Sequence, residues 1–376
     1  MLVSAADNLF DQAEHLLERH QLAAPAVKRI APGQPVGVYI FVRDPAEKDG
    51  QSAVDGTLQL TFPDGRSQVL FQDRQLTEKS VSGDGLLPLA VRFAARPDDP
   101  EGKYVFQLQL CDRNDQSQTQ ATAEFTMTHR APEPLRGDAE SLEKFVNTYY
   151  ADPQPEHLLD FFDAFIAAEP AASRQPNYTP LPILYGLSAA FRRNPQLWRD
   201  LAERSKNLSP KHRKYLAMLI TTIGPDAVAV ADKFADENLR RYLKSQGAVQ
   251  LDFADISSPV HIDALWAEFL FTGGSAPIRR IVGVLGRRDL LSPEEAQAKE
   301  KPLSEEDRRK LVAYVIDQAA QWSLEVNAAR HQLVCNYLEA MLERGELPDA
   351  RATEIVKQNL SKAKRLSHSA GGEEEN

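Results

Sequence analysis

The sequence predicts a protein of two modules, an N-terminal antiparallel β-sandwich followed by an all-α, multi-helix domain of solenoid-like character. Three observations predict this fold class. Short alternating strands dominate the first third, helical spacing dominates the rest, and a stretch rich in Pro, Gly and charge joins them. The expected parts are an N-terminal helix and lead-in at 1–34, the sandwich at 35–130, a linker at 131–140, the helical domain at 141–366 and a disordered tail at 367–376.

The β module is predicted from apolar alternation and turn chemistry. Leu58, Leu60 and Phe62 alternate along one segment, and residues 63–66 (Pro-Asp-Gly-Arg) then form a turn. Pro presets φ, Asp bonds its own backbone and Gly accepts positive φ. Residues 36–42 are largely apolar, which is typical of a central strand. The expected strands are 36–42, 57–62, 69–71, 89–93, 103–111 and 121–127.

Two parts of this module resemble a known family. Residues 101–108 (Glu-Gly-Lys-Tyr-Val-Phe-Gln-Leu), Asp112 and 123–127 (Ala-Glu-Phe-Thr-Met) are similar to the last two strands of immunoglobulin-like (Ig-like) modules on bacterial envelope proteins. In those modules a Gly-x-Tyr sequence often begins a strand, an Asp follows at the end of that strand, and the last strand contains a Phe. Residues 60–65 resemble an earlier hairpin of the same modules. The resemblance covers about 35–128 and implies an Ig-like sandwich, without the Cys…Trp…Cys pattern of antibody domains.

Helices are predicted on both sides of the β module. Before it, residues 5–20 have helical spacing. After it, Pro and Gly stand between helix-length segments rather than inside them. Because no strict repeat period is present, these helices fit an irregular α-solenoid or a multi-helix globule. The expected helices are 141–150, 155–168, 180–193, 195–206, 210–222, one from Pro225, 259–272, 275–286, 305–323, 326–344 and 348–364.

The most distinctive helical stretch is residues 262–281. It resembles a Leu-Trp-x-x-Phe-x-x-Thr-Gly segment in helical domains of uncharacterised bacterial proteins, a resemblance that implies no activity. One interpretation is a tight helical hairpin around a packed Trp266, with Gly273 or Gly274 as a left-handed cap. The other is a partner surface or anion site at the new helix N-terminus. Its residues would be Thr272, Gly273, Gly274, Ser275, Arg279 and Arg280.

Other candidate sites have weaker patterns. His331 and Cys335 have i, i+4 spacing, but zinc needs three or four ligands. Asp112, Asn114 and Asp115 lack the further ligands of a calcium loop and predict a hairpin turn. We therefore expect no metal and no cofactor.

Catalytic residues are not identified by any motif, since the nucleotide-binding and nucleophile signatures are absent. His157, Asp160 and Asp163 could be acid/base groups in a cleft, but they fit the polar face of an amphipathic helix better. Four tyrosines near the start of the helical part suit a partner surface if exposed and a core if buried. They are Tyr149, Tyr150, Tyr178 and Tyr185.

Composition restricts the partners. The net charge of −10 divides almost equally, near −5 on either side of residue 130, so nucleic acid and anionic lipid are disfavoured as partners. No apolar run is long enough to span a membrane. The two cysteines are expected to be free thiols. As written, the N-terminus has no signal peptide and predicts a cytoplasmic protein. Alternatively, Val3-Ser4-Ala5 before Ala6-Asp7 would fit the end of a missing signal peptide, and the protein would then be periplasmic.

The function that these features favour is a non-enzymatic bacterial protein–protein interaction or scaffold protein. The alternative is a hydrolase or carbohydrate-active enzyme with a helical catalytic domain, because paired acids from distant helices escape motif searches. A secretion-system accessory protein is a third possibility.

Overall fold

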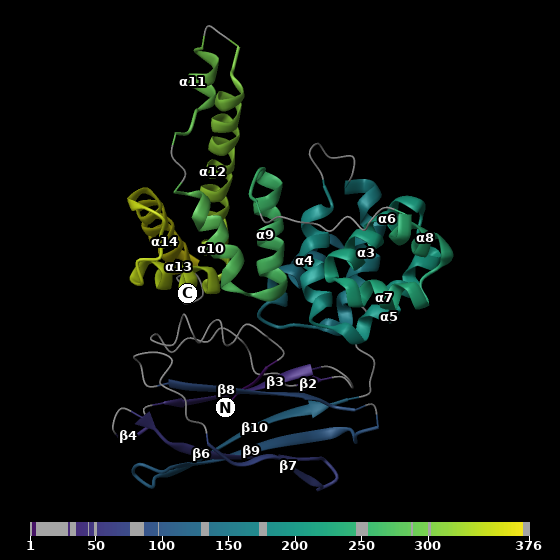
Figure 1. Ribbon diagram of the computed structural model, residues 1–376, viewed down its shortest axis with the longest axis vertical. Helices are drawn as coiled ribbons and strands as arrows, with labels where there is room; N and C mark the ends of the chain where they lie inside the picture. Colours follow the sequence, from purple (N-terminus) through teal and green to yellow (C-terminus); the bar gives the residue numbers. More distant parts are fainter. Residues whose placement is uncertain are drawn as a thin grey trace. The chain divides into compact units, whose positions relative to one another are not determined.

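The computed structural model forms two compact units, Met1–Phe161 and Phe162–Asn376 (Figure 1). The first holds the strands, helix α2 (Ala139–Tyr149) and the start of helix α3 (Leu158–Ala172). The structure describes residues 2–4, 29–30, 35–43, 45–48, 51–75, 86–96, 98–128, 135–172, 179–245, 255–286, 289–299 and 302–370.

Two sheets make up most of the first unit. One has the order β1-β3-β8, and the other has the order β2-β10-β9-β6-β7. All neighbouring pairs in them are antiparallel except β2 with β10, which is parallel. β4 (Glu47–Lys48) and β5 (Gln51–Ser52) form a small separate pair. The strands of the two main sheets are β1 (Leu2–Ser4), β2 (Arg29–Ile30), β3 (Pro35–Arg43), β6 (Val54–Thr61), β7 (Ser67–Gln75), β8 (Leu86–Ala94), β9 (Gly102–Asp112) and β10 (Gln118–Met127).

The alternation of apolar and polar residues in the sequence of β6 matches an alternation of buried and partly exposed side chains in the structure. Every second residue of β6 is buried, so Leu58 and Leu60 point to the core. In the following turn, Gly65 has φ 85° and the Asp64 carboxylate accepts a hydrogen bond from the Arg66 backbone N–H at 3.1 Å. The six predicted strands are confirmed, and β3 lies in the centre of its sheet as its apolar sequence predicted. The predicted helix at 5–20 lies outside the described residues.

Both sheets contribute to one hydrophobic cluster. Val36, Val38 and Ile40 of β3 belong to the same buried cluster as residues of β6, β9 and β10. Phe93 of β8 contacts the rings of Tyr104, Phe106 and Phe125, with centroid distances of 5.7–6.2 Å. The first unit therefore has a core shared by residues of its two sheets.

The helices follow the start and stop signals of the sequence. Ser209 caps α6, Ser304 and Asp307 form a capping box at α12, and Gly273 ends α9 with φ 65°. Besides α2 and α3, the helices are α4 (Leu181–Arg192), α5 (Trp198–Glu203), α6 (Pro210–Ile223), α7 (Pro225–Phe234), α8 (Glu237–Ser245), α9 (Pro259–Thr272), α10 (Ser275–Val284), α11 (Pro293–Gln297), α12 (Glu305–Arg330), α13 (Gln332–Glu343) and α14 (Ala350–Ala370). Three 3₁₀ turns, η2 (Pro155–His157), η3 (Pro195–Leu197) and η4 (Arg204–Asn207), flank α3 and α5.

Two predicted helix ends are wrong. The last helix was expected to end near residue 364, before a disordered tail at 367–376, whereas α14 continues to Ala370. The sequence prediction ended a helix at residue 323 and began another at 326, whereas α12 runs unbroken for 26 residues to Arg330. The 323–326 stretch contains neither Gly nor Pro, and Leu324 is fully buried, so packing favours continuation. The break lies at His331, whose backbone is extended. The prediction also gave no separate elements for α8 and α11.

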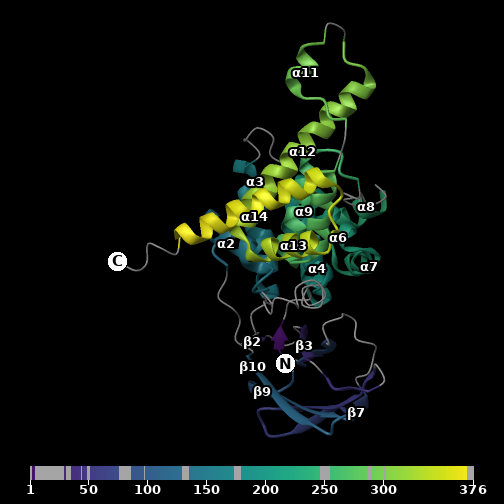
Figure 2. The same ribbon diagram turned by 90° about the vertical axis from the view of Figure 1, so that its left-hand side faces the viewer.

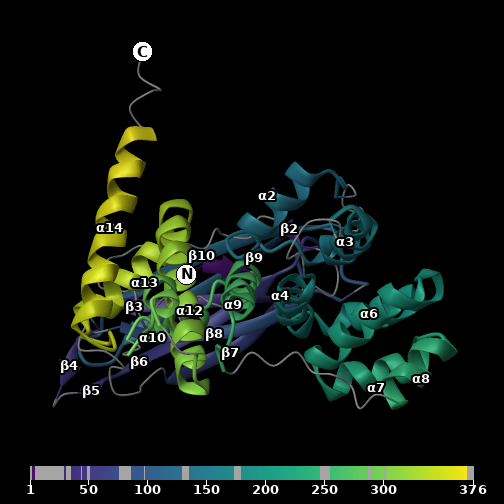
Figure 3. The same ribbon diagram turned by 90° about the horizontal axis from the view of Figure 1, so that it is seen from above.

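Helices of the second unit lie in a row from α14 through α12, α9 and α4 to α6, α7 and α8 (Figure 3). Within the row, α4 and α9 approach each other closely at Gly186 of α4, where an added Cβ would lie 2.7 Å from the Ala267 carbonyl oxygen of α9. At one end of the row, Arg351 of α14 forms a bidentate ion pair with Asp317 of α12, at 2.8 and 2.6 Å. Asp317 is completely buried. Within the described ranges, no helix is both long enough and apolar enough to cross a membrane.

Candidate functional site

The predicted hairpin at 262–281 is built as a tight turn between α9 and α10. Thr272, Gly273 and Ser275 are buried, and so is Trp266. The Thr272 hydroxyl donates to the Glu268 carbonyl at 2.7 Å and accepts from the Gly274 N–H at 3.2 Å. The packed-hairpin interpretation is therefore confirmed.

Carbonyl groups of this turn bind other helices. The Tyr337 hydroxyl of α13 donates to the Gly273 carbonyl at 2.9 Å, and Arg193, which follows α4, donates to the Thr272 carbonyl at 3.2 Å. Arg279 forms an ion pair with Glu346 at 2.5 Å. These contacts fix the turn in place, and an anion site at Gly274 and Ser275 stays a prediction.

Arg280 belongs to a half-buried cluster with Tyr185 of α4 and Glu268 of α9. Burial raises the pKa of the Glu268 carboxyl, while the charge of Arg280 and a hydrogen bond with Tyr185 act in the opposite direction. Burial, followed by the charge of Glu268, raises the pKa of Tyr185. The cluster brings one predicted residue, Arg280, together with two that were not predicted as its partners. It offers a single carboxyl as a proton acceptor, which is not the pair of acids that glycoside hydrolysis uses.

A second candidate surface lies on α12, on a face turned away from the other helices. Trp322 is 70% exposed, Val312 46% and Val315 43%. The opposite face, with Ile316, Ala320 and Leu324, is buried. Figures 1 and 2 both show the N-terminal part of α12 extending past α9 and α10, with α11 beside it. We call the row Val312, Val315, Ala319, Trp322 and Val326 the α12 stripe, in which Val312, Val315 and Trp322 are exposed and Ala319 and Val326 are partly exposed.

The α12 stripe was missed by the sequence interpretation. Its spacing of three and four residues was present in the sequence, but the predicted break at 323–326 divided it between two helices. Apolar residues at that spacing normally face a core, so spacing alone does not separate a buried face from an exposed one. The buried face of α12 is marked in the structure by Asp317, whose partner Arg351 is 34 residues away in the sequence, so no local pattern could have identified it.

The predicted His331–Cys335 pair does not act as one unit. Cys335 is a free, buried thiol that donates to the Ala328 carbonyl, and burial raises its pKa to about 11. His331 is buried against Phe269, and burial lowers its pKa to about 4. Cys111 is also a free thiol, as predicted. In the described part of the chain, no three or more His, Cys, Asp or Glu residues form a group that could hold a metal ion.

His157, Asp160 and Asp163, for which an acid/base role was the less favoured interpretation, do not converge on one site. His157 Nδ1 lies 3.4 Å from a carboxylate oxygen of Asp160. Asp163 instead forms an ion pair with Arg204 at 3.4 Å. These side chains stabilise local structure rather than sharing one site.

The remaining predicted residues have structural contacts. The Asp112 carboxylate accepts from the backbone N–H groups of Ala46 and Asn114, so the turn between β9 and β10 is the expected hairpin. Tyr149 is buried against Phe145, which places it in a core. Tyr178 lies outside the described residues.

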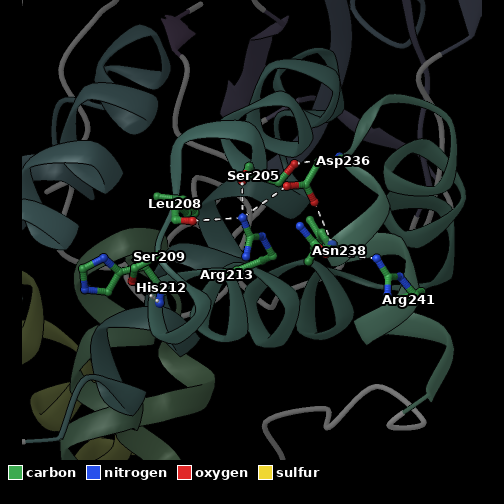
Figure 4. A network of polar contacts seen from close by, with 9 residues as sticks. Ser205, Leu208, Ser209, His212, Arg213, Asp236, Asn238 and Arg241 are labelled. Carbon is green, nitrogen blue, oxygen red and sulfur yellow. Dashed lines mark hydrogen bonds and ion pairs between the residues drawn. The ribbon is translucent and has the colours of Figure 1, made fainter.

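A polar network joins η4, α6 and α8 in the second unit (Figure 4). Arg213 donates to the Leu208 carbonyl at 3.0 Å and pairs with Asp236 at 3.2 Å, and Asp236 accepts from the Leu239 N–H at 2.7 Å. This network lies in a segment, 192–244, with 12 basic and 6 acidic side chains, a net charge of +6. The near-equal charge of the two halves therefore conceals a basic segment, and the absence of nucleic-acid binding stays a prediction.

Comparison with known proteins adds no family, because no protein-family model and no curated protein matches the chain.

Proposed function

We propose that this chain is a non-enzymatic protein–protein interaction or scaffold protein that binds its partner through the α12 stripe. The observation that carries the proposal is the 70% exposure of Trp322 within a row of exposed valines. Tryptophan has the largest apolar surface of any side chain, and burying it stabilises a complex more than burying most residues. A row of such side chains on a projecting helix is typical of a binding surface.

The β module fits the same kind of protein. If it is an Ig-like sandwich, β3 and β8 take the places of strands B and E, and β6, β9 and β10 those of C, F and G. The hydroxyl of Tyr104, near the start of β9, donates to the Pro100 carbonyl four residues upstream at 2.8 Å. This bond matches the tyrosine corner of Ig-like modules and supports the resemblance. The row of helices in the second unit likewise supports a solenoid-like platform.

The hydrolase alternative draws no support from the described residues. Burial raises the pKa of the carboxyls of Glu156, Asp263 and Glu268. Glu156 belongs to the first unit, and Asp263 and Glu268 are five residues apart on α9, a spacing that sets them on different faces of the helix. Saturable turnover of a small substrate, abolished by Glu268→Gln in a folded protein, would nevertheless contradict an interaction protein.

The test is photocrosslinking at the stripe in the cells from which the gene comes. A photoreactive phenylalanine analogue replaces Trp322 in the full chain. The control carries it at Val69, which is 51% exposed on β7. We expect a discrete crosslinked protein from position 322 that position 69 does not give. Absence of crosslinks at 322, or the same products from both positions, would refute the proposal.

A further inference from the structure

We propose that the α12 stripe recognises a single amphipathic helix of a partner protein, whose apolar seam has an acidic side chain at each end. This inference rests on the proposed function and specifies the partner's chemistry. It is argued from the spacing of the stripe, its length and the charges at its two ends.

The spacing of the stripe is that of a coiled-coil seam. From Val312 the steps to the next residues are three, four, three and four. A step pattern that averages 3.5 residues keeps a row of side chains facing a second helix over several turns. A flat surface or a strand does not match this periodicity. The side chains of a second helix do match it, because they pack as knobs into the holes between the residues of the stripe.

The length of the stripe limits the size of the partner element. At a rise of 1.5 Å per residue, the stripe from Val312 to Val326 extends over roughly 21 Å. That length corresponds to two heptads. Trp322 is the largest and most exposed side chain of the stripe and is therefore the expected anchor.

Positive charges stand at both ends of the stripe. Arg308 continues the alternation four residues before Val312, and Arg330 lies four residues after Val326, next to Ala329 where the alternation would continue. Both residues are exposed, and in the described part of the chain neither forms an ion pair. Neighbouring Arg309 and Lys310 are already paired with Glu305 and Glu306.

These two arginines decide between a second copy of this chain and a different partner. If two α12 helices paired in parallel, Arg308 would face Arg308 of the other copy. If they paired antiparallel about Ala319, Arg308 would face Arg330. Like charges repel in either arrangement, and acidic residues at the seam ends of a different helix are attracted instead.

The experiment uses the full chain and two labelled synthetic helical peptides of 21 residues with the same leucine seam. One peptide has glutamate at both seam ends and the other has lysine. Binding is followed by fluorescence anisotropy. We expect the glutamate peptide to bind about tenfold more tightly than the lysine peptide, and this ratio to fall as salt is raised. Trp322→Ala should weaken binding of the glutamate peptide about tenfold or more.

Charge reversal is the matched control. In the double variant Arg308→Glu, Arg330→Glu the preference should invert, so that the lysine peptide binds more tightly. Trp fluorescence of the variants in the absence of peptide checks that the helical unit is folded.

Three results would overturn the inference. They are equal binding of the two peptides, binding of neither, and a dimer in sedimentation equilibrium that Trp322→Ala dissociates, which would make a second copy the occupant. If any of these results occurs but position 322 still crosslinks to another protein in cells, then only this inference fails and the proposed function stands. In that case the stripe would still bind a partner, but not by the chemistry inferred here.

Discussion

The sheet unit and the helical unit are held together by different kinds of contact. In the sheet unit, aromatic and aliphatic side chains from both sheets share one cluster, and the polar atoms of Tyr104 and Asp112 bind backbone groups of turns and loops. In the helical unit, polar contacts link distant helices. Asp317 binds Arg351, 34 residues away, and Tyr337 binds Gly273, 64 residues away.

This difference explains where change is tolerated. A shared apolar cluster is non-directional, and its energy is spread over many side chains. A buried charge has only its partner to compensate the loss of water. Single substitutions of polar groups are therefore expected to have their largest effects in the helical unit.

The largest effect is expected from Asp317→Ala. This change leaves Arg351 without the carboxylate that it binds at two points, and because the Arg351 side chain is 40% exposed and keeps its bond to the Leu285 carbonyl, the free energy of unfolding should fall by up to about 3 kcal/mol. Tryptophan fluorescence is a suitable probe, because Trp198, Trp266 and Trp322 all belong to the helical unit. The exposed ion pair of Glu325 with Lys362 provides the control, and Glu325→Ala should cost about 0–1 kcal/mol. Equal costs for the two substitutions would remove the distinction between buried and exposed pairs.

Acid should destabilise the helical unit through His331. Its pKa is about 4 in the folded protein and near 6.5 when unfolded, so between these values the unfolded chain takes up the proton first. Stability is unaffected by this group above pH 6.5 and falls as pH drops towards 4, by about 3 kcal/mol in total. In urea titrations from pH 7 to pH 4.5, His331→Gln should lose less stability than the unchanged chain. Parallel curves for the two proteins would contradict this assignment.

The sequence predicted the strands well because their signal is local. Leu58, Leu60 and Phe62 alternate with polar residues, and each of them is buried. Helix caps such as Ser209 and Gly273 were predicted for the same reason, since a cap depends on residues within one turn.

Contacts between distant residues could not be predicted in this way. Nothing near Asp317 in the sequence indicates Arg351, and nothing near Tyr185 indicates Glu268. Exposure of Trp322 follows from which face of α12 the rest of the unit covers, and that depends on tertiary packing. The predicted turn residues 272–275 were correctly placed as a hairpin, while the candidate binding surface lay on another helix.

Close approach of α4 and α9 should make Gly186 intolerant of even one methyl group. Gly186→Ala would place a Cβ 2.7 Å from the Ala267 carbonyl oxygen and the Phe271 ring, so a loss of about 1–3 kcal/mol is expected. Gly283 of α10 has open space around it, and Gly283→Ala should stabilise the protein by up to about 1 kcal/mol through helix propensity. The two changes in the free energy of unfolding should have opposite signs in the same fluorescence titration. That result would separate steric crowding at Gly186 from any general effect of introducing alanine. A neutral Gly186→Ala would mean that the two helices move apart at little cost.

The smallest effect is expected in the sheet unit, from Tyr104→Phe. The ring stays in the cluster with Phe62 and Phe125, and only the hydrogen bond to the Pro100 carbonyl is lost. We expect a loss of about 1 kcal/mol, measured as faster amide hydrogen exchange in β9 and β10 by mass spectrometry. Tyr314→Phe in α12 removes a hydroxyl that has no hydrogen bond among the described residues and should change stability by less than about 0.5 kcal/mol. If Tyr104→Phe unfolds the sheets altogether, then a single polar bond dominates there too, and the contrast between the two units fails.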